Sequence, residues 1–363
     1  MVHASRADRE RGGRLASRGC LLQRRYGRLL LRRERARRHV VEAVALRVAY
    51  TERVRILFAG TPQASVPSLQ RLLDAGHDVL AVLTRAPAPA GRRRKLVRSA
   101  VHEEADARGI PVYTPTSLKK DEDVRRAIEE LAPEAVAVVA YGLLIPPALL
   151  EIPRFGWINL HFSLLPQWRG AAPVQYAIAA GQETTGASTF RLEAGLDTGP
   201  VFGSVVEKVG ERETAGELLE RLSHSGAGLL VETFERLGRG AEPVPQSGEP
   251  SYAPSISTAD ARVDWNLDAV TIDRRSRAHT PAPGPWTTLR GTRIKLGPLA
   301  ARPDVVDLQP GQIRPGKPPL AGTGAGAVEL SGVAPAGKKP MDASAWLRGA
   351  RLAPETRFDA EGE

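Results

Sequence analysis

The chain has 363 residues, enough for two ordinary domains, and 42% of them are hydrophobic, which is sufficient for buried cores. Its single cysteine, Cys20, excludes an internal disulfide and any multi-cysteine zinc site. The formal net charge of +10 is located in residues 1–50, which contain 14 Arg, no Lys and 4 acidic residues. The rest of the chain is neutral, so an attraction to nucleic acid would have to come from local basic patches.

Residues 1–53 are rich in arginine and lack the pattern of a packed domain. Three interpretations remain open for them: a disordered or non-native extension, an organelle-targeting segment, or an RNA-binding tail. We expect either that the mature protein begins near Val54 or that residues 1–53 are dispensable for activity. The expected location is cytoplasmic, with an organelle matrix as the alternative if this segment is a transit peptide.

Residues 54–140 alternate between strand and helix patterns. Strands are expected at 55–60, 78–84, 110–113 and 135–140, and helices at 66–73, 100–108 and 121–131. This alternation predicts an α/β fold with a doubly wound, mostly parallel sheet. The first turn reads Gly60-Thr61-Pro62 in place of G-x-G-x-x-G, which disfavours a dinucleotide site. The longest apolar region, 135–150, is broken by glycine and proline, so no membrane span is predicted.

A basic loop is expected between the second strand and the following helix. Residues 85–98 contain two prolines and a glycine, which predict an irregular backbone. Four consecutive basic residues lie near its end: Arg92, Arg93, Arg94 and Lys95. A solvated surface loop is the alternative interpretation for such a charge run.

Tyr141 and Gly142 leave the carboxyl end of the strand at 135–140. Ligands of parallel sheets usually bind at this end of the strands. A binding segment and a buried turn both remain open.

The segment 156–161 predicts a strand with one polar face. Asn159 and His161 alternate with the apolar Ile158 and Leu160. A period of two places both polar side chains on the same face, which could be reactive or only half-solvated.

Two segments downstream complete this region. The sequence Ser163-Leu164-Leu165-Pro166 interrupts the strand, because proline cannot donate to a ladder, and a helix is expected at 174–180. Asp197 lies in a Gly-Leu-Asp-Thr-Gly-Pro turn before a strand at 201–206. An aspartate in this position can also be only a turn former.

A second, smaller domain is expected beyond residue 257. A helix at 214–237 ends the first domain, 54–237, and the Pro/Gly/Ser-rich residues 238–257 predict a linker. Residues 258–352 combine a helix at about 267–278 with short strands such as 293–296 and 327–330, which is typical of a small β-barrel. A tail, 353–363, follows.

The smaller domain carries a net positive charge, although residues 51–363 taken together are neutral. Residues 258–351 contain 14 basic and 8 acidic residues. Lys338 and Lys339 lie in a Pro-Ala-Gly-Lys-Lys sequence and could contact phosphates.

Asn159, His161 and Asp197, together with the sequences S-L-L-P, W-R-G-A-A-P and L-D-T-G, resemble the formyltransferase family that uses 10-formyltetrahydrofolate. The resemblance runs from about Val54 to Leu352 and is strongest to the branch that acts on methionyl-tRNA. It implies a Rossmann-like formyltransferase domain followed by an OB-like β-barrel. It also implies 10-formyltetrahydrofolate as co-substrate and initiator methionyl-tRNA as partner, in translation initiation.

The resemblance assigns roles to the candidate residues. The catalytic positions are Asn159, His161 and Asp197. The folate-site positions are Ser163, Leu164, Leu165 and Pro166 with Tyr141 and Gly142. Arg92 stands where the family's loop contacts the tRNA acceptor stem, beside Arg93, Arg94 and Lys95, and the phosphate contacts of the second domain are Lys338 and Lys339.

Formyl transfer explains why polar residues of these types are needed. A neutral amine attacks the formyl carbon, so negative charge develops on the formyl oxygen and a proton must leave the nitrogen. Asn159 and His161 could both donate to that oxygen, and losing one such donor typically costs about 3–4 kcal/mol. Asp197 would hold the tautomer of His161 and raise its basicity. The reaction needs no metal and no covalent intermediate.

Two other functions remain open. A formyltransferase acting on a small amine, such as a purine precursor or an amino sugar, would not need the basic loop or the basic domain. A non-catalytic folate- or RNA-binding relative would not need the three catalytic residues. We expect a monomer that does not associate with membranes.

Overall fold

The computed structural model describes residues 53–90, 95–353 and 355–360. The expectations for residues 1–52 and for Arg92, Arg93 and Arg94 lie outside the described residues, as does the side chain of Lys95. The described residues from Val54 onward belong to one compact unit. Within these ranges, no helix is both long and apolar enough to cross a membrane.

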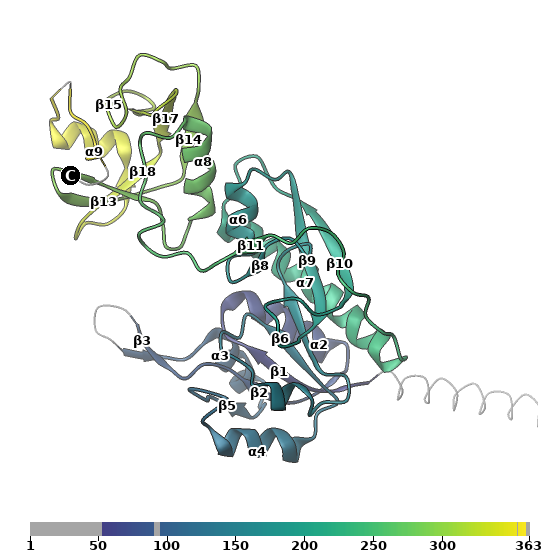
Figure 1. Cartoon of the computed structure of the whole chain (residues 1–363). Coiled ribbons are helices and arrows are strands. Elements are labelled where there is room, and N and C mark those ends of the chain that lie inside the picture. Colours follow the sequence, from purple (N-terminus) through teal and green to yellow (C-terminus); the bar gives the residue numbers. More distant parts are fainter. Residues whose placement is uncertain (1–52, 91–94, 354, 361–363) are drawn as a thin grey trace, which may run out of the picture. The chain divides into compact units, whose positions relative to one another are not determined.

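A seven-stranded sheet forms the centre of the first part of the chain (Figure 1). Its strands are β1 (Arg55–Gly60), β2 (Asp78–Leu83), β5 (Val112–Tyr113), β6 (Ala135–Val139), β7 (Trp157–His161), β9 (Thr184–Arg191) and β10 (Val201–Lys208), in the order β10-β9-β7-β6-β1-β2-β5. Strands β1, β2, β5, β6 and β7 pair in parallel, whereas β9 is antiparallel to both of its neighbours. The predicted mostly parallel, doubly wound sheet is confirmed.

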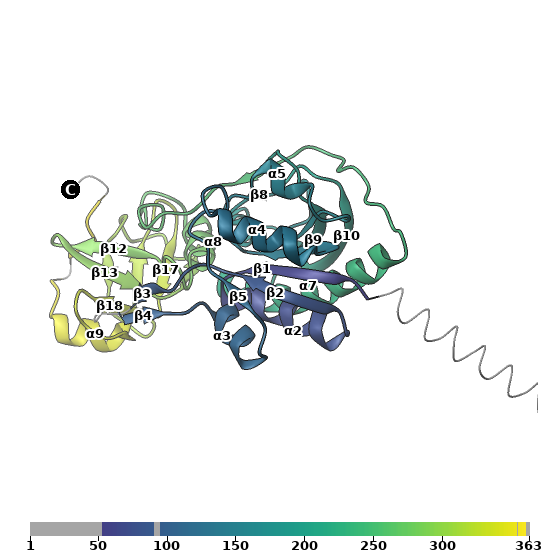
Figure 2. The same cartoon turned by 90° about the horizontal axis from the view of Figure 1, so that it is seen from below.

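Helices cover both faces of this sheet. One core packs against α2 (Val66–Asp74), α3 (Ala100–Ala107), α6 (Pro173–Ala179) and α7 (Ala215–Gly238). A second core packs against α4 (Glu122–Leu131) and α5 (Pro147–Leu150). Figure 2 shows α4 and α5 on the opposite side of the sheet from α2 and α3.

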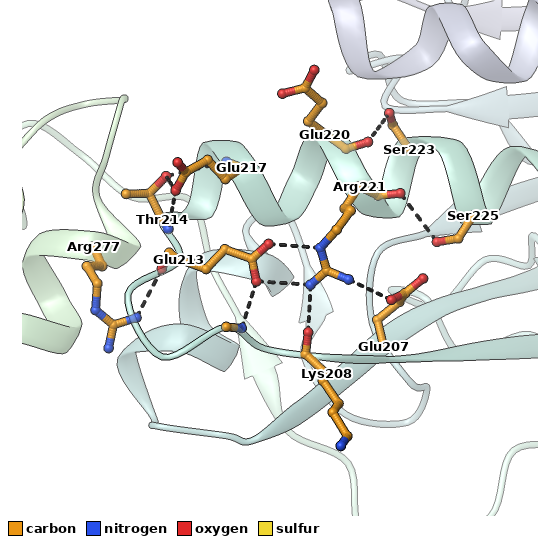
Figure 3. A network of polar contacts seen from close by, with 11 residues as sticks. Glu207, Lys208, Glu213, Thr214, Glu217, Glu220, Arg221, Ser223, Ser225 and Arg277 are labelled. Atoms are coloured by element: carbon orange, nitrogen blue, oxygen red, sulfur yellow. Dashed lines mark hydrogen bonds and ion pairs between the residues drawn. The ribbon is translucent and has the colours of Figure 1, made fainter.

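Polar contacts fix the beginning of α7, the longest of these helices. Thr214 caps it by accepting from the backbone N–H of Glu217, while the Glu217 carboxylate accepts from the backbone N–H of Thr214. One turn further on, the guanidinium of Arg221 contacts Glu207 and Glu213 (Figure 3). These contacts hold the helix against the end of β10.

The strand order places the candidate residues at one edge of the sheet. The chain turns in opposite directions from the neighbouring strands β1 and β6, and the carboxyl ends of parallel strands at such a point form the usual ligand crevice of this fold. Gly60 is paired with Val139, and Val139 with Leu160. His161, the last residue of β7, therefore lies at this crevice.

The second part of the chain is built from short antiparallel strands around a separate core. One four-stranded sheet contains β12 (Trp286–Leu289), β13 (Thr292–Leu296), β18 (Gly332–Pro335) and β19 (Met341–Asp342). The other contains β14 (Leu299–Arg302), β17 (Ala327–Leu330), β16 (Leu320–Gly322) and β15 (Ile313–Arg314). Helices α8 (Ala269–Ala278) and α9 (Ala343–Ala350) pack on the same core. The prediction of a second domain with short antiparallel strands is confirmed, and these strands form two four-stranded sheets. Their closure into an OB-like β-barrel stays a prediction, as do the boundaries 54–237, 238–257, 258–352 and 353–363.

One segment differs from the expectations, and one strand of the central sheet was not expected. Strands β3 (Ala88–Ala90) and β4 (Lys95–Val97) pair antiparallel where an irregular backbone was expected. Pro89 is tolerated there, because both strands of a two-stranded ribbon are edge strands. The buried strand β9 has no apolar pattern, since Thr185, Ser188 and Thr189 occupy its interior positions.

Candidate active site

Strand β7 places two of the predicted catalytic residues on one face at the crevice. Asn159 is half-buried, and the side chain of His161 is only 6% exposed. Register pairs Asn159 with Phe190 and His161 with Ser188 on β9. The ring of Phe190 meets the imidazole edge-on, with centroids 6.3 Å apart, so His161 is packed as well as hydrogen-bonded.

The hydrogen bond of His161 determines its tautomer. Its Nε2 lies 2.9 Å from the backbone carbonyl oxygen of Trp168. A carbonyl can only accept, so Nε2 carries the proton and, in the neutral ring, Nδ1 carries the lone pair. The basic nitrogen of His161 is therefore Nδ1.

Asp197 faces this basic nitrogen. Its Oδ2 lies 3.8 Å from Nδ1 of His161, too far for a hydrogen bond but close enough to stabilise the ring when it is protonated. The same oxygen accepts a 2.7 Å hydrogen bond from the backbone N–H of Gly170. The backbone of Asp197 has φ +50°, a conformation that few non-glycine residues adopt.

The surroundings of His161 lower its pKa below the usual value. Burial is the largest cause, because it disfavours the charged ring, while the charge of Asp197 and the hydrogen bond to Trp168 act in the opposite direction. The imidazole is therefore neutral at neutral pH, as a general base must be.

These contacts correct two expectations from the sequence. The tautomer of His161 is set by the carbonyl of Trp168 and not by Asp197. The charge of Asp197 does raise the pKa of the ring, as expected, but burial lowers this pKa by more. The only N–H of the neutral ring is engaged by Trp168, so His161 is not free to donate to a formyl oxygen, and Asn159 remains as the side-chain donor on this face of β7.

The segment Ser163-Leu164-Leu165-Pro166 is fixed by its own hydrogen bonds beside the site. The buried Ser163 donates through Oγ to the carbonyl of Gln167 at 2.5 Å, and the hydroxyl of Ser188 donates to the carbonyl of Ser163 at 2.8 Å. Leu164 packs against Gly186 of β9, where a Cβ would lie 2.6 Å from its side chain. Leu165 is half-buried and Pro166 buried, so this segment forms a rigid wall at the end of β7.

Tyr141 lies in the interior, which favours the buried turn of the two interpretations left open by the sequence. Its ring is 2% exposed and packs in the core beneath α4 and α5, and burial raises the pKa of its hydroxyl. The side chain of Tyr141 therefore does not line the open edge of the sheet. Gly142, with φ +81°, is exposed there. The backbone carbonyl of Tyr141 accepts from Thr61 across the crevice at 2.9 Å.

Sequence reasoning missed several residues that contact the site. Gln246 and Ser251 belong to the predicted linker, yet they bond to the turn at Asp197 and to the loop at Trp168. The short strands β8 (Arg169–Gly170) and β11 (Tyr252–Ala253) pair in parallel. This pairing joins the predicted linker to the loop that follows Trp168. The Pro/Gly/Ser composition of this segment correctly indicated an irregular backbone but carried no signal of where it lies.

The predicted tRNA-contacting residues lie apart from these side chains. The backbone of Lys95 belongs to β4. Lys338 and Lys339 are exposed in the turn between β18 and β19, and neither ammonium forms an ion pair with any described residue. Among the described residues no group of His, Cys, Asp and Glu could hold a metal ion. The expectation that the reaction needs no metal stays a prediction.

Comparisons with known proteins find matches to both parts of the chain. Residues 52–234 match the family model described as formyl transferase, and residues 255–351 match the one described as formyl transferase, C-terminal domain. The methionyl-tRNA formyltransferase of Arthrobacter sp. (strain FB24) is 56% identical over 298 residues, which cover 82% of this chain and 97% of that protein.

Two solved structures are similar in fold. HypX from Aquifex aeolicus, in complex with tetrahydrofolic acid, matches with a TM-score of 0.59 and 18% identity over 81% of this chain and 47% of that one. An N-formyltransferase from Helicobacter canadensis, in complex with folinic acid and dTDP-3-aminofucose, matches with a TM-score of 0.57 and 16% identity over 76% of this chain and 98% of that one.

Proposed function

The chain belongs to the formyl transferase family, and from this membership we propose that it transfers the formyl group of 10-formyltetrahydrofolate to the α-amino group of initiator methionyl-tRNA. The observation that carries this proposal is the 56% identity to a methionyl-tRNA formyltransferase over 97% of that protein, which includes the second domain. The amino-sugar enzyme is similar at only 16% identity, which favours the tRNA acceptor over a small amine.

His161 acts as the general base in this reaction. The amine nitrogen bonds to the formyl carbon, and Nδ1 of His161 takes the proton that leaves the nitrogen. The imidazolium so formed lies 3.8 Å from the carboxylate of Asp197, which stabilises its charge. The bond from the formyl carbon to the folate nitrogen then breaks, and the imidazolium returns its proton to that departing nitrogen. No side chain forms a covalent intermediate.

Asn159 stabilises the charge on the formyl oxygen. It shares a strand face with His161, so its amide can donate to an oxygen whose carbon is near Nδ1. The folate co-substrate binds along the wall formed by residues 163–166 and at Gly142. This placement is supported by the rigid hydrogen bonding of Ser163 and by the position at the carboxyl ends of the strands.

The tRNA binds to basic residues away from the chemistry. Arg92, Arg93, Arg94 and Lys95 contact its acceptor end, and Lys338 and Lys339 contact phosphates, which is supported by the exposure of the two lysines. The enzyme acts as a monomer in the cytoplasm.

A transfer assay tests the proposal. Labelled formyl is followed from 10-formyltetrahydrofolate to charged initiator tRNA, to free methionine and to an amino sugar, with His161→Ala as the background. We expect transfer to the charged tRNA to exceed transfer to the small amines by orders of magnitude. Equal transfer to an amino sugar would favour the small-amine alternative, and no transfer to any acceptor would favour a non-catalytic relative.

A further inference from the structure

The segment from Val244 to Ala253, which we call the 244–253 segment, lies against the candidate active site. Its Val244 exchanges two backbone hydrogen bonds of 2.8 Å with Val201 at the start of β10. At its other end, Tyr252 and Ala253 pair with Arg169 and Gly170. The chain between these anchors brings Gln246 and Ser251 to the turn and the loop that hold the catalytic groups.

Gln246 joins the turn of Asp197 to the loop at Arg169. Its Nε2 donates to the backbone carbonyls of Asp197 and Gly199, each at 2.8 Å. Its Oε1 accepts from Nε and Nη2 of Arg169, at 3.2 and 2.7 Å. Both ends of the amide are therefore fully used, and its orientation is fixed by its partners.

The two contacts to Asp197 hold opposite sides of a strained residue. Its carboxylate is held by the N–H of Gly170, and its carbonyl is held by Gln246. A non-glycine residue at φ +50° persists only where its surroundings determine the conformation. Position 170 requires glycine, because a Cβ there would lie 2.6 Å from the carbonyl oxygen of Ala253.

Ser251 holds Trp168 in the same way. Its Oγ accepts from the N–H of Trp168 at 2.9 Å, and its carbonyl accepts from the N–H of Arg169 at 2.8 Å. The peptides on both sides of Trp168 are thereby clamped, and Trp168 also has a left-handed backbone, with φ +57°. The carbonyl of Trp168 is the group that binds Nε2 of His161.

We propose that Gln246 and Ser251 are positioning residues for formyl transfer, Gln246 acting through the backbone of Asp197 and Ser251 through the carbonyl of Trp168 on the tautomer of His161. The inference rests on the proposed function, because it concerns the same site. It makes the segment that connects the two matched family domains a structural part of the active site. Neither side chain touches the reacting atoms.

Kinetics of three variants test this assignment. Ser251→Ala removes the acceptor for Trp168, whereas Ser251→Thr keeps it. Gln246→Glu keeps the acceptor oxygen for Arg169 but replaces the amide N–H groups by a carboxylate oxygen. This oxygen cannot donate to the carbonyls of Asp197 and Gly199. We expect Ser251→Ala and Gln246→Glu to lower kcat at least about tenfold with KM for both substrates changed less than about threefold, since misplacing a catalytic group affects mainly the transition state. Ser251→Thr should recover most of the activity.

Matched controls come from the same chain. Ser257 makes a comparable hydrogen bond, to the N–H of Asp260, and Gln309 is an exposed glutamine in the second domain. Ser257→Ala and Gln309→Glu should keep wild-type kcat. If wild type transfers formyl and the two site variants match these controls, or change KM alone, the inference is wrong. If wild type transfers no formyl, the proposed function is wrong instead.

A spectroscopic measurement is independent of turnover, and its wild-type result does not depend on how Ser251→Ala folds. The ¹⁵N shifts of labelled histidine, assigned with His161→Gln, report which ring nitrogen carries the proton. In the neutral wild-type protein we expect protonated Nε2 and unprotonated Nδ1. In Ser251→Ala the two shifts should move toward each other as the tautomers mix. A wild-type ring protonated at Nδ1 would overturn the inference, as would Ser251→Ala spectra identical to wild type.

Discussion

Nδ1 of His161 and Oδ2 of Asp197 face each other at 3.8 Å without a hydrogen bond, because the proton of the neutral ring is on the opposite nitrogen. Two electron-rich atoms are thus held close until a proton arrives between them. The carboxylate of Asp197 favours protonation of Nδ1 during the reaction, and the burial of the ring favours loss of that proton afterwards.

The pH profile should reflect the depressed pKa of His161. Burial lowers this pKa below its usual value of about 6.5, and the ring must be neutral to accept a proton. Since kcat/KM also declines as the acceptor amine is protonated, the titration of the ring is followed by the ¹⁵N shifts of His161, and we expect its midpoint below pH 6.5. A ring whose ¹⁵N shifts titrate with a midpoint above pH 7 would show that it is not the desolvated base described here.

Asp197→Asn should keep the geometry and weaken the base. The amide oxygen can still accept from the N–H of Gly170, but the charge that raises the pKa of His161 is lost. We expect turnover to fall about a hundredfold and the acid limb of the profile to move to lower pH. Turnover across pH 5–9 checks both effects, and near-normal activity throughout would remove Asp197 from the mechanism.

Asn159→Ala should remove the donor to the formyl oxygen. Turnover is expected to fall by at least about a hundredfold, with folate binding within a few-fold of wild type, because the interaction strengthens in the transition state. Asn266→Ala is the matched control, since Asn266 is exposed in the second domain and bonds only locally to Asp264. A variant that lost binding but kept turnover would contradict the oxyanion role.

The two basic regions should have separable effects on tRNA. Arg92→Ala should lower both turnover and tRNA affinity, since a contact at the acceptor end also positions the amine. Lys338→Ala combined with Lys339→Ala should raise KM, spare kcat and flatten the salt dependence by up to about one log unit per lost phosphate contact.

Lys119 and Lys120 supply the control for that experiment. They are an exposed lysine pair before α4, so replacing both by alanine removes the same charge elsewhere. KM for tRNA should then stay at its wild-type value. A lysine-pair variant at 338 and 339 that altered only turnover would contradict the proposed division between affinity and positioning.

Gly170→Ala should destabilise the protein. The backbone has φ +123°, and a Cβ would lie 2.6 Å from the carbonyl of Ala253, so the loop must shift. We expect a loss of about 2 kcal/mol in the free energy of unfolding, measured by denaturant titration. Gly228→Ala, inside α7 with open space around it, should instead stabilise by about 0.5–1 kcal/mol.

The sequence predicts what local patterns can encode. The buried strands β1, β2 and β6 are apolar runs, and Thr214 with Glu217 marks the start of α7, so these elements follow from residues that are neighbours in sequence. The pair Asn159 and His161 follows equally from the period of a strand.

The features that the sequence did not predict depend on distant contacts. Strand β9 is polar, and its buried Thr189 and Ser188 are tolerated because they bond to Thr233 and Ser204. The contact of Ser251 with Trp168 spans 83 residues. The place of Tyr141 in the core is set by helices packed over it. None of these partners can be read from a local pattern.

The position of the 244–253 segment has a consequence for dividing or recombining this enzyme. A fragment ending at Leu237 would contain Asn159, His161 and Asp197 but would lack Gln246, Ser251 and the partner strand of β8. A chimaera that exchanges the second domain with that of a relative should therefore be joined after Ala253.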